Sequence, residues 1–245
     1  IKIREGFLIV AIFWFVLSFF GAIPFLMDES LKFSLVDAVF ESASGWTTTG
    51  ATVISNIDNL NKPLLLYRQL LQWLGGIGIV VLVLAILPIL GVGGMYLYKA
   101  ETSSPVKDNK LSPRITETAK SLWGVYIVLT IACAVLYKIA GMSYFDAIGH
   151  SFSTVSIGGF STHDASIGFY SSDLIKIICM VFMFLSALNF VLHFLFYKNK
   201  SLTVYTSNSE MKSFLLIIII LLSLVAIFST AVSYTHLTLP TKPSV

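Results

Sequence analysis

The chain has 245 residues, of which 56% are hydrophobic and only 12% are charged, and its formal net charge is +3. Soluble domains carry about 25% charged residues, so this composition excludes an ordinary soluble domain and indicates an all-α polytopic membrane protein. Cys133 and Cys179 lie in apolar runs with no neighbouring His or Cys. We therefore expect two buried thiols that act as small hydrophobes, without a disulfide or a metal site.

Five apolar runs are long enough to cross a hydrocarbon core of about 30 Å as helices. They cover roughly 6–27, 64–98, 120–140, 173–197 and 213–232. The first is too long for a signal peptide, so we expect it to span the membrane. The second is too long for one straight helix, and Pro88 with the glycines at 91, 93 and 94 predicts a kink or break. Two shorter segments, 34–46 and 143–155, would measure about 20 Å as helices and can enter the membrane only partway.

The positive charges predict the orientation of these spans. Ten of the sixteen Lys and Arg residues fall before the first span and in the connections that follow the second and the fourth. The remaining connections carry fewer basic residues and the acidic residues Asp28, Glu29, Asp58, Asp164 and Asp173. By the positive-inside rule, the N-terminus is cytoplasmic and both short segments enter the membrane from outside.

A short polar pattern occurs twice, 109 residues apart, each time between two apolar runs. Residues 34–52 and 143–161 align without a gap and share six identities in nineteen positions. The identical pairs are Ser34 and Ser143, Asp37 and Asp146, Ala38 and Ala147, Ser42 and Ser151, Ser44 and Ser153, and Gly50 and Gly159. This agreement is well above chance, so we interpret the pattern as a duplicated pore loop.

Each copy begins with the residues of a capping box, Ser34 with Asp37 and Ser143 with Asp146. The serine accepts a hydrogen bond from the first turn, and the aspartate faces the positive end of the helix dipole. We therefore expect these four residues to start two short pore helices near the outer surface. The negative C-terminal end of each helix then lies inside the membrane, where it favours a cation.

The residues after each short helix are mainly Thr, Ser, Gly and Ala. Irregular backbone at membrane depth must be buried in protein or line a water-filled cavity, and its carbonyls replace the hydration shell of an alkali cation. Gly50 and Gly159 permit the backbone angles required, and the hydroxyls of Thr47 and Ser156 are candidate ligands at the inner end. The predicted filter consists of Thr47, Thr48, Thr49, Gly50, Ala51 and Thr52 with Ser156, Ile157, Gly158, Gly159, Phe160 and Ser161.

The alternative is that each of these stretches is a plain extracellular turn. Two copies, each with a capping box and each between spans, favour the pore. Neither turn contains a carboxylate, which argues against a divalent-ion site, and we expect no transition-metal site.

At these residues the sequence resembles the TrkH/KtrB superfamily of potassium transporters, specifically its TrkH branch. Four segments carry the resemblance, over about residues 1–231. They are Asp37-Ala-Val-Phe-Glu-Ser-Ala-Ser-Gly45 with Thr47–Thr52; Gln72-Trp-Leu-Gly-Gly-Ile-Gly-Ile79; Ala100-Glu-Thr102 with Lys107–Arg114; and Thr154-Val-Ser-Ile-Gly-Gly-Phe-Ser161. Members of this family resemble potassium channels in having four linked helix–pore-loop–helix repeats around one pore. The filter glycine of each repeat falls here on Gly50 and Gly159.

The resemblance implies a division of the chain into repeats. We expect a first repeat over 1–99, a cytoplasmic basic linker over 100–118, a second repeat over 119–200, and a linker with the first helix of a third repeat over 201–232. The polar tail 233–245 does not resemble the third pore loop of the family, and we expect it to be non-native. The chain is therefore expected to be a fragment with two of four repeats.

The resemblance also implies the function. We expect the pore-forming subunit of a bacterial potassium uptake system in the inner (plasma) membrane, with K⁺ as the transported ion and no cofactor. Expected partners are the lipid bilayer, a cytosolic nucleotide-binding regulatory subunit of the TrkA type facing the basic linker, and a second copy of the full-length protein; no nucleic acid is expected. We expect no enzymatic activity. The alternative is a membrane-embedded enzyme or scaffold whose re-entrant segments serve only packing.

Other polar or small residues inside the apolar runs have simpler interpretations. Gly75-Gly76-x-Gly78 follows no strand, so close helix packing is favoured over a dinucleotide site. Asn189 and His193 lie four apart, where an interhelical hydrogen bond is favoured over a proton relay. His150 occupies the position that matches Glu41 and implies no metal geometry. For Arg68, a snorkelling charge and a brace that binds pore carbonyls remain equal alternatives.

Overall fold

The computed structural model describes residues 3–86 and 111–237, and within these ranges its regular structure is helical throughout. The predicted all-α fold is confirmed. The expected break around Pro88, and the part of the predicted linker before residue 111, lie outside the described residues.

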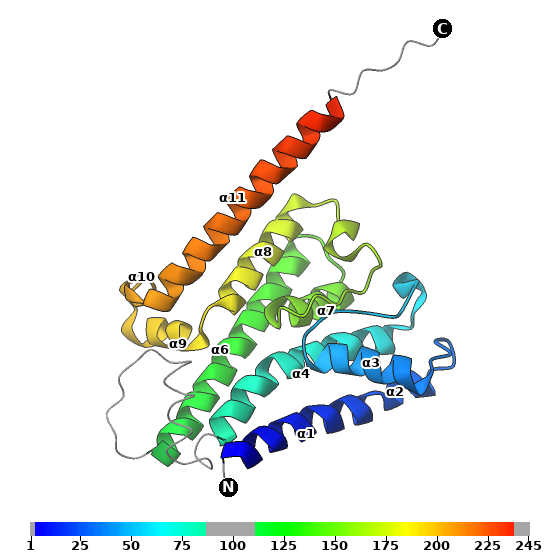
Figure 1. The fold of residues 1–245 in the computed structure, drawn as a ribbon, viewed down its shortest axis with the longest axis horizontal. Coiled ribbons are helices and arrows are strands. Elements are labelled where there is room, and N and C mark those ends of the chain that lie inside the picture. The colour runs from blue at the N-terminus through cyan, green and yellow to red at the C-terminus, as the bar shows by residue number, and fades with distance from the viewer. Residues whose placement is uncertain (1–2, 87–110, 238–245) are drawn as a thin grey trace. The chain divides into compact units, whose positions relative to one another are not determined.

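The first repeat has a helix, a short re-entrant helix and a second long helix. Its elements are α1 (Ile3–Gly21), α2 (Ile23–Met27), α3 (Leu35–Trp46), the 3₁₀ turn η1 (Ile57–Asn59) and α4 (Lys62–Ile86). The break between α1 and α2 comes just before Pro24, which lies in the first turn of α2, because a proline cannot continue the hydrogen bonds of the preceding helix. The short α3 packs against both α1 and α4, which flank it in Figure 1.

The second repeat has the same order of elements. They are α6 (Leu111–Ile139), α7 (Tyr144–Val155), the 3₁₀ turn η2 (Ser166–Phe169) and α8 (Asp173–Ala187). The helix α6 begins inside the stretch predicted as linker. The short α7 packs against α6 and α8 of its own repeat and also against α4 of the first. Both predicted pore helices are therefore present, and α4 contacts both of them.

The predicted fourth span, 173–197, is not one straight helix. It consists of α8 and α9 (Phe190–Asn199), bent by 91° at a two-residue break. At the break, the Asn189 side chain accepts a hydrogen bond from the Val191 N–H at 3.0 Å, and His193 Nε2 pairs with the Leu185 carbonyl at 2.9 Å. His193 thus bonds across the break to the other helix of the same predicted span, and Asn189 lies at the break, so the two residues do not share one helix face as predicted.

The chain divides into two compact units, Ile1–Phe194 and Leu195–Val245. In the second unit, α10 (Thr203–Ser207) precedes α11 (Ser209–Leu237). The helix predicted over 213–232 is confirmed, and α11 continues to Leu237, into the first residues of the stretch predicted as a tail. Residues 231–237 contain no proline, and the first one follows at Pro240, so nothing in this stretch forbids a helix.

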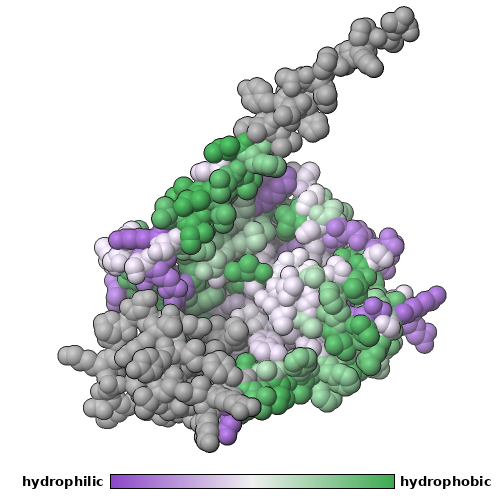
Figure 2. Space-filling view, viewed as in Figure 1, coloured by the Kyte–Doolittle hydropathy of each residue, from purple (hydrophilic) through white to green (hydrophobic). Residues whose placement is uncertain are grey.

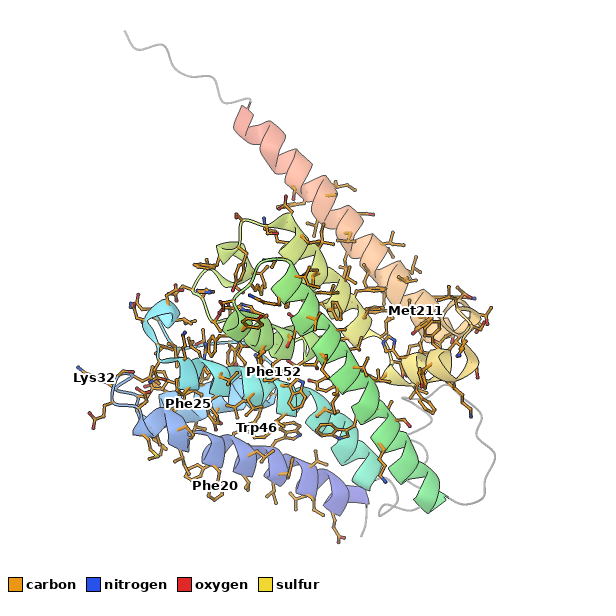
Figure 3. The ribbon with its side chains drawn as sticks, turned by 180° about the vertical axis from the view of Figure 1, so that it is seen from behind. Phe20, Phe25, Lys32, Trp46, Phe152 and Met211 are labelled. Carbon is orange, nitrogen blue, oxygen red and sulfur yellow. The ribbon has the colours of Figure 1, made fainter. Side chains whose placement is uncertain are left out.

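Three helical segments of the described part are long and apolar enough to cross a membrane. They are Leu8–Met27, Lys120–Ile139 and Ser209–Ser229, and the α8–α9 pair is a fourth if it is counted as one span. Figure 2 shows hydrophobic residues over α1 and polar residues where α2 connects to α3. Phe20, 62% exposed on α1, points away from the other helices in Figure 3. Cys133 and Cys179 are both free and buried, as predicted.

Candidate functional site

Serine caps start both short helices. Ser34 Oγ accepts the Asp37 N–H at 3.2 Å while the Asp37 carboxylate accepts the Ser34 N–H at 3.1 Å, which completes a capping box. In the second repeat, Ser143 Oγ accepts the Asp146 N–H at 3.1 Å and donates to Asp146 Oδ2 at 2.7 Å. The other carboxylate oxygen of Asp146 accepts from Thr162 Oγ1 at 2.7 Å. Asp146 therefore ties the start of α7 to the chain beyond the second loop, a role that Asp37 lacks.

Both short helices also end in the same way. The N–H of Thr49 bonds the carbonyl of Ser44 and that of Thr48 bonds Gly45; the second repeat has the matching pairs Gly158 with Ser153 and Ile157 with Thr154. This is the Schellman pattern, which requires a left-handed residue after the helix. That residue is Thr48 (φ +53°) in one copy and Ile157 (φ +56°) in the other. Both are β-branched, for which this conformation is strained.

The two predicted filter loops meet at their glycines. Gly50 has φ +76° and Gly159 has φ +83°, so both adopt the left-handed backbone that glycine permits. A Cβ atom on Gly50 would lie 2.1 Å from the carbonyl oxygen of Gly158, whereas a Cβ on Gly159 would meet no described atom within 4 Å. The two glycines thus have the same backbone conformation. Their surroundings differ, because only Gly50 has the backbone of the other loop packed against it.

The inner-end hydroxyls donate back to their own helices. Thr47 Oγ1 donates to the Ala43 carbonyl at 2.7 Å, and Ser156 Oγ donates to the Ser153 carbonyl at 3.2 Å. The proton of each hydroxyl is thereby occupied. Thr47 Oγ1 also lies 2.8 Å from Thr49 Oγ1 and accepts its proton, so one lone pair of Thr47 is used as well.

Gln72 of α4 holds the second loop. Its fully buried side chain donates from Nε2 to the Gly158 carbonyl at 2.7 Å and accepts the Phe160 N–H on Oε1 at 3.0 Å. One turn further along α4, Gly75 lies against the Trp46 carbonyl and Gly76 against Ser156. The predicted close packing at these glycines is confirmed, since a Cβ on either would come within 3.0 Å of a pore-helix end. Figure 3 shows Trp46 and Phe152, which come from the two short helices.

A buried ion pair braces both loops. Arg68 Nη2 lies 2.8 Å from Glu41 Oε1, and neither side chain is exposed to solvent. Glu41 also accepts hydrogen bonds from Thr52 Oγ1 at 2.9 Å and from the Val53 N–H at 3.1 Å. Arg68 donates to the Ser161 carbonyl at 3.3 Å. Of the two alternatives for Arg68, the carbonyl-bonding brace is therefore confirmed.

The second repeat replaces the carboxylate by an imidazole. His150, at the position that matches Glu41, pairs through Nε2 with Ser161 Oγ at 2.9 Å, and Ser161 matches Thr52. Each short helix thus bonds the hydroxyl of its own loop from the same position. His150 Nδ1 pairs with the Asp146 carbonyl at 2.9 Å, which leaves neither ring nitrogen for a metal.

Beyond the loops, two acidic residues exchange hydrogen bonds between the repeats. Asp164 Oδ1 accepts the Ile57 N–H at 2.9 Å, and Asp58 Oδ2 accepts the Asp164 N–H at 3.3 Å. The ring of His163 pairs with Asp58 Oδ1 at 2.6 Å and stacks on Phe169. The hydrogen bond from His163, followed by that from the Asp164 backbone, lowers the pKa of Asp58 below its usual value.

Four residues of the site were not predicted from the sequence: Glu41, Gln72, Asp58 and His163. A signal existed for Glu41, because a carboxylate and the Arg68 guanidinium inside apolar segments require each other as partners. No comparable signal existed for Gln72, whose two bonds depend on how α4 packs against the second loop. Among the residues that the structure describes, no group of three or more His, Cys, Asp or Glu is placed to hold a metal ion.

These features define a class: a membrane protein built from helix–pore-loop–helix repeats whose loops converge. The sequence model of the TrkH family, described as a cation transport protein, matches residues 1–241. The chain belongs to the TrkH family, and the resemblance seen in its motifs is confirmed.

Named relatives agree with this assignment. The chain is 54% identical over 233 residues to the Trk system potassium uptake protein TrkH of Halomonas elongata, covering 94% of this chain and 48% of that protein. It is 56% identical over 215 residues to the TrkH of Escherichia coli, covering 88% and 44%. The crystal structure of the potassium transporter TrkH from Vibrio parahaemolyticus has a TM-score of 0.77 at 50% identity, covering 90% of this chain and 44% of that one. The chain thus spans about half the length of these relatives.

Proposed function

We propose that this chain forms two of the four quarters of a K⁺ pathway in a bacterial potassium uptake system. The observation that carries the proposal is the pair of loops that follow the same backbone course and meet where Gly50 lies against Gly158. Relatives that are more than half identical are named potassium uptake proteins, which supports K⁺ as the cargo.

In this proposal, the filter consists of the backbone from Thr47 to Thr52 and from Ser156 to Ser161. Carbonyl oxygens of the loops replace the water around the ion, and the C-terminal ends of α3 and α7 add negative potential at the same place. The Gly158 carbonyl already accepts a bond from Gln72, so it serves to fix the loop. The hydroxyl oxygens of Thr47 and Ser156 supply further ligands. Ser34, Asp37, Ser143 and Asp146 cap the pore helices and so aim the loops.

The wider assembly follows from the same proposal. The protein transports K⁺ and catalyses no covalent reaction, and it lies in the inner membrane with a cytoplasmic N-terminus. The chain supplies the repeats 1–99 and 119–200. The basic linker 100–118 faces a regulatory subunit of the TrkA type, and the full-length protein pairs with a second copy.

Uptake of Rb⁺ by cells that lack other potassium uptake systems tests the proposal. In the full-length protein that carries this segment, Gly50→Ala and Gly159→Ala should each lower Rb⁺ uptake, by about tenfold or more for Gly50→Ala, since alanine adds left-handed strain and a clash with the second loop. Gly124→Ala is the matched control, because Gly124 on α6 has no described neighbour within 4 Å of a Cβ. Rb⁺ uptake at the unsubstituted rate in both loop variants would overturn the proposal.

A further inference from the structure

Gln72 connects one repeat to the loop of the other. It belongs to α4 of the first repeat, yet both of its hydrogen bonds go to the second loop. Its amide nitrogen and oxygen reach the two peptide groups on either side of Gly159, one as donor and one as acceptor. A side chain that holds both neighbours of a glycine fixes the orientation of the peptide units that the glycine would otherwise leave free.

The hydrogen bond from Gln72 to the Gly158 carbonyl affects both loops, because Gly158 lies where the two loops meet. Its carbonyl oxygen accepts the Gln72 amide at 2.7 Å and also lies 2.1 Å from the place that a Cβ on Gly50 would occupy. The first loop must therefore have glycine at position 50 for the second loop to keep its bond to Gln72. Gly50, Gly158 and Gln72 form a single interlock, named here the glycine–glutamine lock.

Burial alone does not explain why the Gln72 side chain bonds to the second loop. The neighbouring Gln69 is equally inaccessible to solvent and is on the same helix, but neither its amide nitrogen nor its amide oxygen has a hydrogen-bond partner among the described residues. Its side chain packs against Gly149 of the second short helix, since a Cβ on that glycine would lie 3.5 Å from Gln69 Cγ. The two glutamines therefore share helix, size and burial and differ in whether they hold a loop, which makes Gln69 a matched control.

We propose that Gln72 is a positioning residue for ion selection: through the glycine–glutamine lock it holds the second loop at the spacing that suits K⁺ and prevents contraction around Na⁺. The inference rests on the proposed function. Discrimination between alkali ions depends on how firmly the coordinating carbonyls keep their number and positions. Loss of the lock frees the Gly158 peptide to rotate, so discrimination against Na⁺ should fall more than the maximal transport rate.

The test compares Rb⁺ flux with and without competing Na⁺, in liposomes containing the full-length protein, for Gln72→Met and Gln69→Met. Methionine preserves volume and removes both hydrogen bonds. We expect Gln72→Met to lower the preference for Rb⁺ over Na⁺ about tenfold, within the range that the loss of two ordinary hydrogen bonds gives. Gln69→Met should keep the original preference. When Gly50→Ala is combined with Gln72→Met, the preference for Rb⁺ over Na⁺ should fall little further, because both substitutions break the same lock.

A second variant separates positioning from folding. In Gln72→Glu, the protonated carboxyl donates to Gly158 and accepts from Phe160 just as the amide does, whereas the ionised form sets an oxygen against the Gly158 carbonyl. Burial raises a carboxyl pKa, so the preference for Rb⁺ should be close to the original at pH 5 and decline as the pH rises towards 9. The unsubstituted protein should not show this decline.

The outcomes distinguish the two proposals. Absence of Rb⁺ flux through the unsubstituted protein contradicts the proposed function. Normal flux and an unchanged preference in Gln72→Met overturn the role of Gln72. If Gln72→Met does not insert into liposomes, the role is overturned by Gln72→Glu when its preference matches that of the unsubstituted protein throughout the pH range.

Discussion

At the scale of single residues, the site is braced by the fully buried ion pair of Arg68 and Glu41. Both side chains are wholly removed from solvent, and burying an unpaired charge is far more costly than burying a paired one. The pair is completed by bonds to Thr52, Val53 and Ser161. The two side chains of the ion pair thus form their further hydrogen bonds with the ends of both predicted filter loops.

We predict that Glu41→Gln destabilises the full-length protein by about 3–5 kcal/mol, because it leaves the Arg68 charge buried without its counterion. The double variant Glu41→Met with Arg68→Met should recover much of this loss. Thermal unfolding of the detergent-solubilised protein measures both effects. Equal unfolding temperatures for Glu41→Gln and the unsubstituted protein would show that the pair contributes no net stabilisation.

At the scale of elements, the two pore helices are aimed by their ends. Serine caps fix where each helix starts, and Schellman patterns fix where it stops and how the chain turns into the loop. The turn uses Thr48 and Ile157, although glycine or asparagine is usual at a left-handed position. The same strained choice in both repeats places side chains directly at the entrance to each loop.

We predict that Thr48→Gly relieves left-handed strain and raises the free energy of unfolding by up to about 1 kcal/mol. Thr48→Ala keeps a Cβ and should give no comparable gain, so it serves as the control. Chemical denaturation followed by tryptophan fluorescence compares the two variants. A stability of Thr48→Gly below that of Thr48→Ala would contradict the prediction, because it would show that removal of the Cβ brings no relief of strain at this position.

At the scale of the whole first unit, α4 and the loops join the two repeats at three levels. The aspartates beyond the loops accept backbone hydrogen bonds from the opposite repeat, Gln72 ties α4 to the second loop, and Gly75 and Gly76 contact the ends of both short helices. The repeats therefore do not pack as independent modules. The second loop is held by Gln72 and Arg68 of the first repeat as well as by residues of its own repeat.

The aspartates beyond the loops should make the stability of the protein sensitive to acid. The pKa of Asp58 is lowered in the folded protein, so its carboxylate stabilises the fold above its ordinary pKa of about 3.9, and this contribution disappears as the pH falls through the folded value. Unfolding temperatures measured from pH 7 to pH 3 should converge for the unsubstituted protein and Asp58→Asn below about pH 4. Curves that stay parallel would show that Asp58 does not contribute in this way.

Local features of the site were predictable from the sequence, and contacts between distant segments were not. The caps at Ser34 and Ser143 and the left-handed glycines depend on neighbouring residues, so short patterns identify them. The bonds of Gln72 and the partner of Arg68 depend on tertiary packing, which hydropathy does not encode. The break at Asn189 was missed because a single polar residue hardly changes the mean hydropathy of a long apolar run.

One turn of α4 contacts the ends of both short helices, and this contact affects how the two loops can move. Because adjacent glycines on one helical turn contact Trp46 on one side and Ser156 on the other, a shift of α4 along its axis displaces the two pore-helix ends together. In the proposed pore, the two loops are therefore expected to move together when α4 moves, and not one at a time.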